Sequence, residues 1–307
     1  SVVLKPAEET PLTTIRLAEL LLEAGLANGE VNVVTGYGET AGAAIAAHDG
    51  IAKVGFTGST EVGKLIVKAA AGNLKKVTLE LGGKAPIMIF DDADLSKAIP
   101  GAAMGIFANS GQACIVGSRL FVHRKVYDQV VEGIAAIAQG MVLGNPADPS
   151  THLGPLISAK QANRVMGFIE EGKANGCQVV TGGARADRPG HFVQPTVMTG
   201  VTPDMRLYKE EIFGPVLAVI PFEDEAETIK LANDTPYGLA AGVWTQDISR
   251  AHRIAAELEA GSVWINCQLA TDLSMPFGGY KQSGWGRENG FDGVESYLQT
   301  KSVFAEL

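Results

Sequence analysis

The sequence has few cysteines and histidines, and it has no long apolar run. Its three cysteines, at positions 114, 177 and 267, form no Cys-x-x-Cys pair, and its five histidines show no metal-ligand spacing. We therefore expect neither a disulfide framework nor a metal site, and the free thiols favour a reducing, cytoplasmic location. No apolar run approaches the roughly 18 residues of a membrane-spanning helix, so we expect no membrane partner.

Positive charge is also scarce. The chain has 25 lysines and arginines against 34 aspartates and glutamates, which gives a formal net charge of -9 at pH 7. The basic residues form no run, so the sequence lacks the electrostatic footprint of a protein that binds nucleic acid or an anionic surface. We expect no nucleic acid partner.

What the sequence does contain is enough apolar material for a large core. With 307 residues, of which 46% are hydrophobic, the chain is long enough for roughly two domains. Its first part alternates strand and helix patterns, and this βαβ order predicts a parallel sheet with helices on its faces. We expect Thr10 to cap the first helix, Pro11 to begin it, Gly25 to end it and Ser59 to cap the second. The expected strands are 1–4, 31–36, 51–58 and 75–83, and the expected helices are 13–23 and 59–72.

From Gly82 onward the pattern predicts a second α/β unit. The segment 296–304, "SYLQTKSVF", alternates like a strand but has no neighbour in sequence, so we expect an edge or intersubunit strand there. The expected helices of this unit are 94–108, 125–140, 159–175, 225–233 and 247–260, and the expected strands are 118–123, 178–183, 215–222, 241–245 and 261–266.

Two glycine-containing turns follow strands in the first part, "TGYGETAG" at 35–42 and "FTGST" at 56–60. Such a turn can bring backbone N–H groups and a helix N-terminus to a phosphate. Each turn is equally well explained as a simple connection between a strand and a helix, and Ser59 is a suitable cap in either case. The turns alone leave both interpretations open.

Two residues are candidates for catalysis. Cys114 lies in "FANSGQAC", and a lone cysteine is more often a buried small hydrophobe than a nucleophile. Glu80 ends a predicted strand in "LELGGK", where a carboxylate is usually solvated. Open α/β sheets nevertheless bind ligands at the carboxyl ends of their strands, which makes Glu80 a candidate general base.

These two motifs carry a resemblance. "LELGGKAP" at 79–86 and "FANSGQAC" at 107–114 are similar to the two signature motifs of the aldehyde dehydrogenase superfamily, NAD-dependent and non-acylating. The segment 266–288 is most similar to the betaine aldehyde and phenylacetaldehyde dehydrogenase groups. Five further motifs match in order: "KPAEETP" at 5–11, "FTGST" at 56–60, "EEIFGPV" at 210–216, "WIN" at 264–266 and "PFGGYKQSGWGRE" at 276–288.

The resemblance implies an α/β fold in three parts. Residues 1–83 would be an incomplete Rossmann-like cofactor domain with a parallel sheet, 84–288 an α/β catalytic domain, and 289–307 an oligomerisation segment of a homodimer or homotetramer. Relatives also carry a "WNFP"-type motif, whose asparagine is an oxyanion donor, in a part that would precede residue 1. A catalytically crippled fragment with a structural or regulatory role is therefore the alternative to an active enzyme.

The resemblance also implies roles for the two catalytic candidates. Cys114 would attack an aldehyde carbonyl to give a thiohemiacetal and then a thioester, and Glu80 would activate the water that hydrolyses this thioester. An acylating enzyme that uses coenzyme A would lack the glutamate. A glyceraldehyde-phosphate-type enzyme would need a histidine partner for its cysteine. The substrate tunnel would be lined by Gln268, Leu269 and Asp272.

The cofactor contacts implied by the resemblance are those of NAD. Lys5 and Glu8 would hold the adenosine ribose, and the carboxylate of Glu8 would repel the 2′-phosphate of NADP. Gly58 and Ser59 would meet the pyrophosphate at a helix N-terminus. For the nicotinamide ribose the resemblance implies a contact from Glu211, with Phe213 packed beside it.

Overall fold

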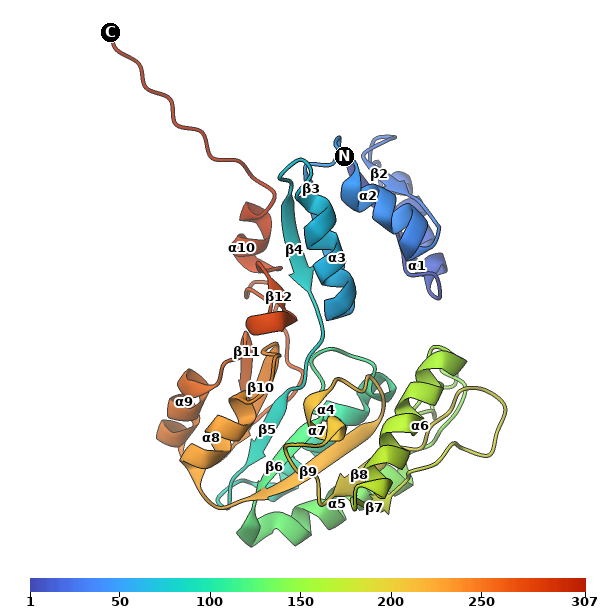
Figure 1. Ribbon diagram of the computed structural model, residues 1–307, viewed down its shortest axis with the longest axis vertical. Coiled ribbons are helices and arrows are strands. Elements are labelled where there is room, and N and C mark those ends of the chain that lie inside the picture. The colour runs from blue at the N-terminus through green and yellow to red at the C-terminus, as the bar shows by residue number, and fades with distance from the viewer. The chain divides into compact units, whose positions relative to one another are not determined.

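The computed structural model describes residues 1–307, and the chain divides into two compact units, Ser1–Thr78 and Leu79–Leu307 (Figure 1). Strand β4 (Lys76–Glu80) carries the chain from the first unit into the second. No helix has both the length and the apolar character needed to cross a membrane.

The first unit follows the predicted βαβ order. Strands β1 and β2 pair in parallel, with Val2 opposite Val31. Thr10 occupies the position before the first helix, but its side chain makes no capping hydrogen bond, whereas the Ser59 hydroxyl accepts one from the Val62 amide at 3.3 Å. The elements are β1 (Val2–Leu4), α1 (Pro11–Glu23), β2 (Val31–Val33), the π-turn η1 (Gly38–Gly42), α2 (Ala43–Ala47), β3 (Lys53–Thr57) and α3 (Thr60–Ala70).

The second unit is built on a seven-stranded sheet with the order β11-β10-β5-β6-β9-β8-β7. All neighbours pair in parallel except β7 and β8, which are antiparallel. A separate two-residue strand, β12 (Gly284–Trp285), pairs antiparallel with the end of β4. The sheet strands are β5 (Pro86–Ile89), β6 (Arg119–His123), β7 (Gln178–Thr181), β8 (Thr196–Thr199), β9 (Val216–Phe222), β10 (Ala240–Trp244) and β11 (Ser262–Ile265).

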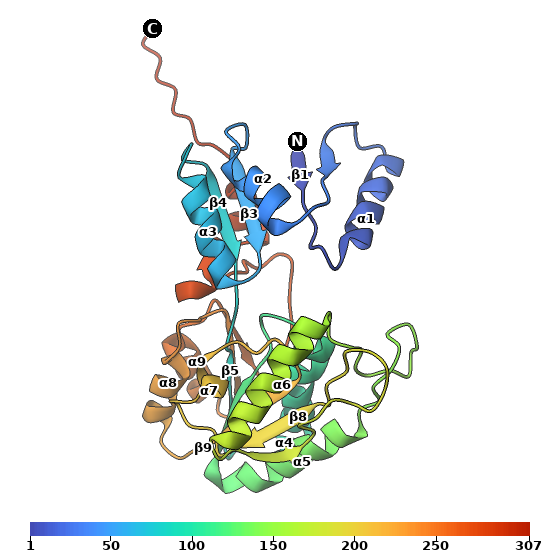
Figure 2. The same cartoon turned by 45° about the vertical axis from the view of Figure 1, so that its right-hand side comes forward.

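Helices cover both faces of this sheet (Figure 2). Leu120 and Val122 of β6 pack with residues of α4 and α5, whereas Phe121 faces the other way and packs with α6 and α8. Alternate residues of one strand therefore enter two different cores, as expected for a sheet buried on both sides. The helices are α4 (Leu95–Phe107), α5 (Tyr127–Gly140), α6 (Ala159–Ala174), α7 (Arg206–Lys209), α8 (Glu225–Asn233), α9 (Ile248–Glu257) and α10 (Gly290–Glu295), and the 3₁₀ turns are η2 (Ala108–Gly111), η3 (Arg124–Val126) and η4 (Lys281–Ser283).

Three strands were not predicted from the sequence: β5, β8 and β12. Strand β5 lies between β10 and β6 in the middle of the sheet, and all four of its residues are buried. A strand that is buried on both faces shows no polar and apolar alternation, so the sequence "PIMI" has no strand period.

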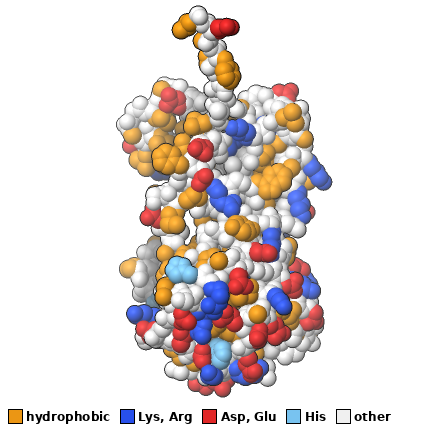
Figure 3. Space-filling model, turned by 90° about the vertical axis from the view of Figure 1, so that its left-hand side faces the viewer, with side chains coloured by type: hydrophobic (Ala, Val, Ile, Leu, Met, Phe, Trp, Pro, Cys, Tyr) orange, Lys and Arg blue, Asp and Glu red, His pale blue; other side chains and the backbone are white.

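The C-terminal segment carries no strand within this single chain. Residues 299–307 have no regular secondary structure, and Val303 and Phe304 are 81% and 94% exposed. Hydrophobic side chains, coloured orange, lie along the extended segment at the top of Figure 3. The predicted pairing of this segment with a neighbouring subunit stays a prediction.

Candidate active site

Cys114 lies on a loop whose backbone is held in an uncommon conformation. Between α4 and the cysteine, the residues Asn109, Ser110 and Gly111 have φ values of 51°, 56° and 70°. Glycine adopts this left-handed region readily, whereas a residue with a Cβ atom adopts it uncommonly, asparagine more often than most. Here the Ser110 hydroxyl donates to the Gly154 carbonyl at 2.8 Å, and a side chain on Gly111 would come within 2.2 Å of the Gly214 carbonyl oxygen.

Glu80 is buried at the end of β4, where it pairs with Gly284 of β12. Its side chain is 4% exposed, and its Oε2 atom has no hydrogen-bond partner. Burial and the negative charge of Glu288 raise the pKa of Glu80 to about 8, against a smaller opposing effect of Arg287. A carboxyl group with this pKa can take and release a proton near neutral pH, as a general base must.

The two signature motifs meet through Gly83. A Cβ atom on this glycine would lie 2.2 Å from the carbonyl oxygen of Cys114, so only glycine lets the two loops approach this closely. The Glu80 segment is also fixed from the other side, because the Leu81 amide donates to the Ser283 carbonyl at 2.8 Å. Gly83 therefore brings the Glu80 segment into contact with the Cys114 loop, and the charge of Glu80 acts on the thiol.

Burial and the charges of this site keep the thiol protonated. Burial, together with the negative charges of Glu211 and Glu80, raises the pKa of Cys114 to about 11, against an opposing effect of the backbone amides of Cys114 and Ile115. At neutral pH the sulfur is consequently a thiol in this state of the protein. Ionisation requires either a proton acceptor or a nearby positive charge.

Glu211 is the third acidic group of this site. Its Oε1 atom accepts a hydrogen bond from the Gly83 amide at 3.0 Å, so the carboxylate lies against the same loop that carries Glu80. Burial raises the pKa of Glu211, whereas the Gly83 N–H and the positive charges of Lys84 and Arg164 lower it. Phe213, two residues later, is 36% exposed and has a φ of 58°.

Helix α6 holds the backbone of residues 210–213, the acidic loop that contains Glu210 and Glu211. The side-chain amide of Gln161 donates to the carbonyls of Ile212 and Phe213 at 2.9 and 2.8 Å, and the Arg164 guanidinium donates to the carbonyl of Glu211 at 2.8 Å. The sequence analysis gave no role to Gln161 or Arg164. Their spacing of three residues places them on one helix face. Because polar residues on one face of a helix are usually solvated, this spacing did not indicate a role for them.

Arg287 and Glu288 were quoted in a motif but received no role from the sequence analysis. Both exert their charge on Glu80, and the backbone of Glu288 pairs with that of Phe277.

No group of three or more histidine, cysteine, aspartate or glutamate residues is arranged to hold a metal ion.

The predicted tunnel residues lie in three different environments. The amide of Gln268 is turned inward, where its Cγ would lie 2.5 Å from a Cβ on Gly105, and neither polar atom has a partner. Leu269 packs against the small core cluster around Trp264. Asp272 is exposed and accepts hydrogen bonds from Ser274.

The remaining cofactor candidates lie in the first unit. Lys5 and Glu8 form an ion pair at 3.1 Å, and a hollow beside Glu8 is lined by the "TGY" turn at 35–37. Ser59 begins the 11-residue helix α3, and a Cβ on Gly58 would come within 2.4 Å of the Phe56 ring. An acceptor carboxylate beside a hollow and a capped helix N-terminus suit a ribose and a phosphate respectively, so these residues fit a dinucleotide.

Comparison with known proteins decides the family. Residues 1–303 match the sequence profile of the Aldehyde dehydrogenase family. The chain belongs to this family. The family resemblance noted in the sequence and the predicted α/β fold are thereby confirmed.

The relatives agree in sequence and in structure. The cytosolic aldehyde dehydrogenase 1 of Rattus norvegicus is 52% identical over 308 residues, which cover 100% of this chain and 62% of the relative. The NAD⁺ complex of an aldehyde dehydrogenase from Bacillus cereus is 52% identical with a TM-score of 0.98, covering 100% of this chain and 62% of that one. Betaine aldehyde dehydrogenase from Staphylococcus aureus, also solved with NAD⁺, is 44% identical with a TM-score of 0.95, covering 98% of this chain and 60% of that one.

This aldehyde dehydrogenase family member thus spans about three fifths of the length of the relatives that it matches.

Proposed function

We propose that the protein oxidises an aldehyde to a carboxylic acid with NAD, through a covalent intermediate on Cys114. The observation that carries this proposal is the close packing of Gly83 on the Cys114 carbonyl, which places Glu80 within electrostatic range of the thiol. Family membership supports the same activity. So do the NAD⁺ complexes of the Bacillus cereus and Staphylococcus aureus relatives.

The chemistry divides between two residues. The Cys114 sulfur forms a bond to the carbonyl carbon of the aldehyde while the thiol proton passes to the carbonyl oxygen, so that a thiohemiacetal results. Bound NAD would supply the oxidation by accepting a hydride, and loss of the hydroxyl proton leaves a thioester on Cys114. Glu80 then takes a proton from water as the water oxygen attacks this thioester, the carbon–sulfur bond breaks to release the acid, and the proton passes from Glu80 to the departing sulfur to restore the Cys114 thiol. A base is needed because neutral water attacks a thioester slowly.

The residues of each unit fit different parts of the cofactor. In the first unit, Lys5 and Glu8 hold the adenosine ribose, and Gly58 and Ser59 hold the pyrophosphate at the start of α3. A carboxylate that accepts from a free 2′-hydroxyl repels a 2′-phosphate, so NAD is preferred over NADP. In the second unit, the nicotinamide ribose is bound by Glu211 with Phe213 beside it.

The remaining assignments follow the family. The substrate is a larger aldehyde of the betaine aldehyde or phenylacetaldehyde type, in keeping with the name of the Staphylococcus aureus relative. Residues 1–83 form the cofactor domain, 84–288 the catalytic domain, and 289–307 join subunits of a homodimer or homotetramer. The location is the cytoplasm, as the name of the Rattus norvegicus relative states for that protein.

Aldehyde-dependent NADH formation by the purified chain tests the proposal. We expect turnover with at least one member of a panel of aliphatic, aromatic and amino aldehydes. Cys114→Ala should abolish this turnover and retain NAD binding. Cys267→Ala is the matched control, because Cys267 is an exposed thiol outside the Glu80 and Glu211 cluster.

Two outcomes would count against an active enzyme. Turnover that survives in Cys114→Ala would remove the cysteine from the mechanism. NAD binding without NADH formation across the panel would favour the alternative, a catalytically crippled chain with a structural or regulatory role.

A further inference from the structure

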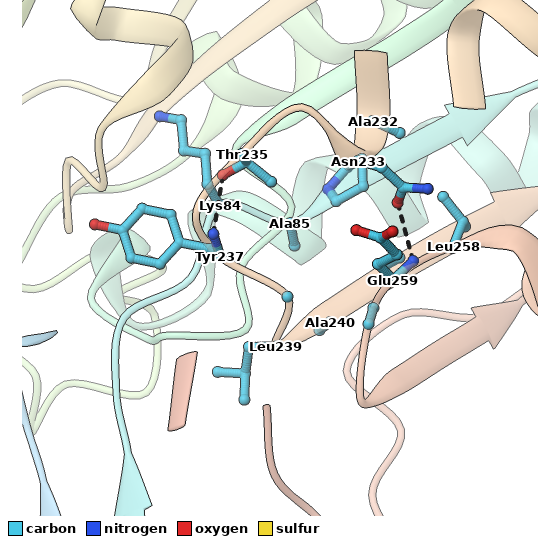
Figure 4. Close-up of a pocket in the computed structure, with 14 residues that line it drawn as sticks. Lys84, Ala85, Ala232, Asn233, Thr235, Tyr237, Leu239, Ala240, Leu258 and Glu259 are labelled. Carbon is cyan, nitrogen blue, oxygen red and sulfur yellow. Dashed lines mark hydrogen bonds between the residues drawn. The ribbon is translucent and has the colours of Figure 1, made fainter. Parts of the chain in front are cut away.

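Lys84 is a buried amine without a hydrogen-bond partner. Its side chain is 1% exposed, and its Nζ atom is among the few buried polar atoms that have no partner. Figure 4 shows the Lys84 amine and the Tyr237 hydroxyl reaching to the same side, away from Asn233 and Glu259. A buried ammonium is costly unless it is compensated by charge, so the position of Lys84 calls for a physical reason.

The backbone of Lys84 is fixed next to the acidic loop. Arg119, which is fully buried, donates from Nε to the Lys84 carbonyl at 2.9 Å and also holds the Ala232 carbonyl at 2.7 Å. The preceding residue, Gly83, donates its amide to Glu211. The residue that carries this amine is therefore the direct neighbour of Gly83, whose amide binds the Glu211 carboxylate.

The charged groups around Lys84 come from two other elements, β6 and α6, and from the acidic loop. Glu211 and Glu210 favour its charged form, whereas Arg119 of β6 and Arg164 of α6 oppose it. Tyr237 adds a hydroxyl whose pKa is raised by burial and by the same two carboxylates.

Of the two carboxylates, only that of Glu210 has an ion-pair partner. Glu210 already pairs with Arg206 at 2.7 Å, and Arg164 directs a hydrogen bond to the Glu211 backbone rather than to its carboxylate. Burial lowers the pKa of Lys84 to about 7 and raises that of Glu211, and each of the two groups opposes the shift of the other. Each group therefore favours the charged form of the other.

We propose that Lys84 is a positioning residue for Glu211. The buried ammonium of Lys84 keeps the Glu211 carboxylate ionised at the Gly83 amide, so that this carboxylate can accept a hydrogen bond from the cofactor ribose. This inference rests on the proposed function, because it requires that Glu211 binds NAD.

The pH dependence of NAD binding tests this role. Removal of the ammonium in Lys84→Met, or in Lys84→Gln if the first variant folds poorly, should raise the pKa of Glu211. The pH at which NAD affinity is lost on the acid side should then rise by about 1 unit, and the Kd should be about tenfold higher at pH values well below the wild-type pKa of Glu211. The Kd for NAD is measured by fluorescence titration between pH 5.5 and 9, with a thermal melt of each variant.

The matched control is Lys75→Met, which removes another buried lysine amine. Lys75 is 8% exposed and donates to the Ala46 and His48 carbonyls in the first unit. We expect this variant to lower the melting temperature and leave the pH profile of NAD binding in place. A profile displaced equally by Lys75→Met and Lys84→Met would overturn the inference, since it would reflect general destabilisation.

A double-mutant cycle separates this inference from the proposed function. If Lys84 acts through Glu211, Lys84→Met should add nothing to the Kd of Glu211→Gln. Additive effects, or an unshifted profile in Lys84→Met, would overturn the role of Lys84 and leave Glu211 as a cofactor ligand. A wild-type chain that does not bind NAD, or a Glu211→Gln variant with unchanged affinity, would overturn both.

Discussion

The Ser283 hydroxyl donates a 2.6 Å hydrogen bond to the carbonyl of Gly82, although 201 positions separate the two residues in the sequence. The same hydroxyl accepts from the Gly238 amide at 2.9 Å. One buried side chain thus joins the segment that follows Glu80 to two distant parts of the second unit.

Ser283→Ala should destabilise the protein measurably. The Gly82 carbonyl and the Gly238 amide would both lose a partner in a buried place, which costs about 1 to 3 kcal/mol of the free energy of unfolding. Urea unfolding measures this loss. Ser274→Ala is the control, because Ser274 lies in an exposed turn and its removal should change stability by less than about 0.5 kcal/mol; equal losses in the two variants would contradict the prediction.

Glu80→Gln should separate the two chemical steps. Without a base, the thioester on Cys114 forms but is not hydrolysed, so we expect a burst of NADH close to one equivalent per active site and no steady turnover. In the wild type, steady turnover should rise with pH through about 8 and level off above it, because Glu80 must be ionised to take a proton from water. Stopped-flow absorbance measures both quantities, and steady turnover at the wild-type rate in Glu80→Gln would exclude Glu80 as the base.

The raised pKa of Glu80 also predicts a pH-dependent stability. An acid whose pKa is higher in the folded state binds more protons when folded, so its contribution to stability is greatest below the unfolded pKa of 4.5 and is lost as pH rises toward about 8. Glu80→Gln removes this titration. The variant should therefore gain stability relative to wild type between pH 5 and 8, as measured by urea unfolding at each pH, and a constant difference across this range would argue against a buried, titrating Glu80.

Gly82→Ala should displace Glu211 without unfolding the protein. The added methyl would lie 2.5 Å from Oε2 of Glu211 and 3.2 Å from the ring of Tyr237, and the end of the glutamate side chain can move away. Loss of the hydrogen bond from Gly83 should weaken NAD binding about tenfold, which corresponds to about 1.4 kcal/mol. Isothermal titration calorimetry gives the Kd.

Gly167→Ala is the control for this substitution. Gly167 lies inside α6, and no atom lies within 4 Å of its added methyl. We expect up to about 1 kcal/mol of added stability and unchanged NAD affinity. Weakened NAD binding in this variant too would mean that the effect at Gly82 does not come from contact with Glu211.

Deletion of residues 299–307 should lower the oligomer mass. Phe304 and Val303 are almost fully exposed in the single chain, and apolar side chains of this kind are normally covered by a partner. Light scattering of the full and shortened chains compares their masses. An oligomer of unchanged size after the deletion would show that this segment does not join the subunits.

Much of the fold could be predicted from local patterns. The alternation of strands and helices predicted the parallel pairing of β1 with β2 in the first unit and the α/β character of the second, and Ser59 was recognised as a helix cap from its position alone. Strand β5 was missed because burial on both faces removes the alternation by which strands are recognised. The capping bond expected of Thr10 is absent, although the helix does begin after it.

The sequence by itself determined the candidates for catalysis and for cofactor binding, since Cys114, Glu80 and Glu211 stand in motifs that resemble those of the aldehyde dehydrogenase family. Only the tertiary structure decided which groups support them. Ser283, Lys84, Gln161 and Arg164 act on segments that are distant in sequence or through a buried charge, and neither kind of relation leaves a local pattern. The reason is physical: a side chain's partners and its pKa depend on what folding places around it, whereas a motif records only its neighbours along the chain.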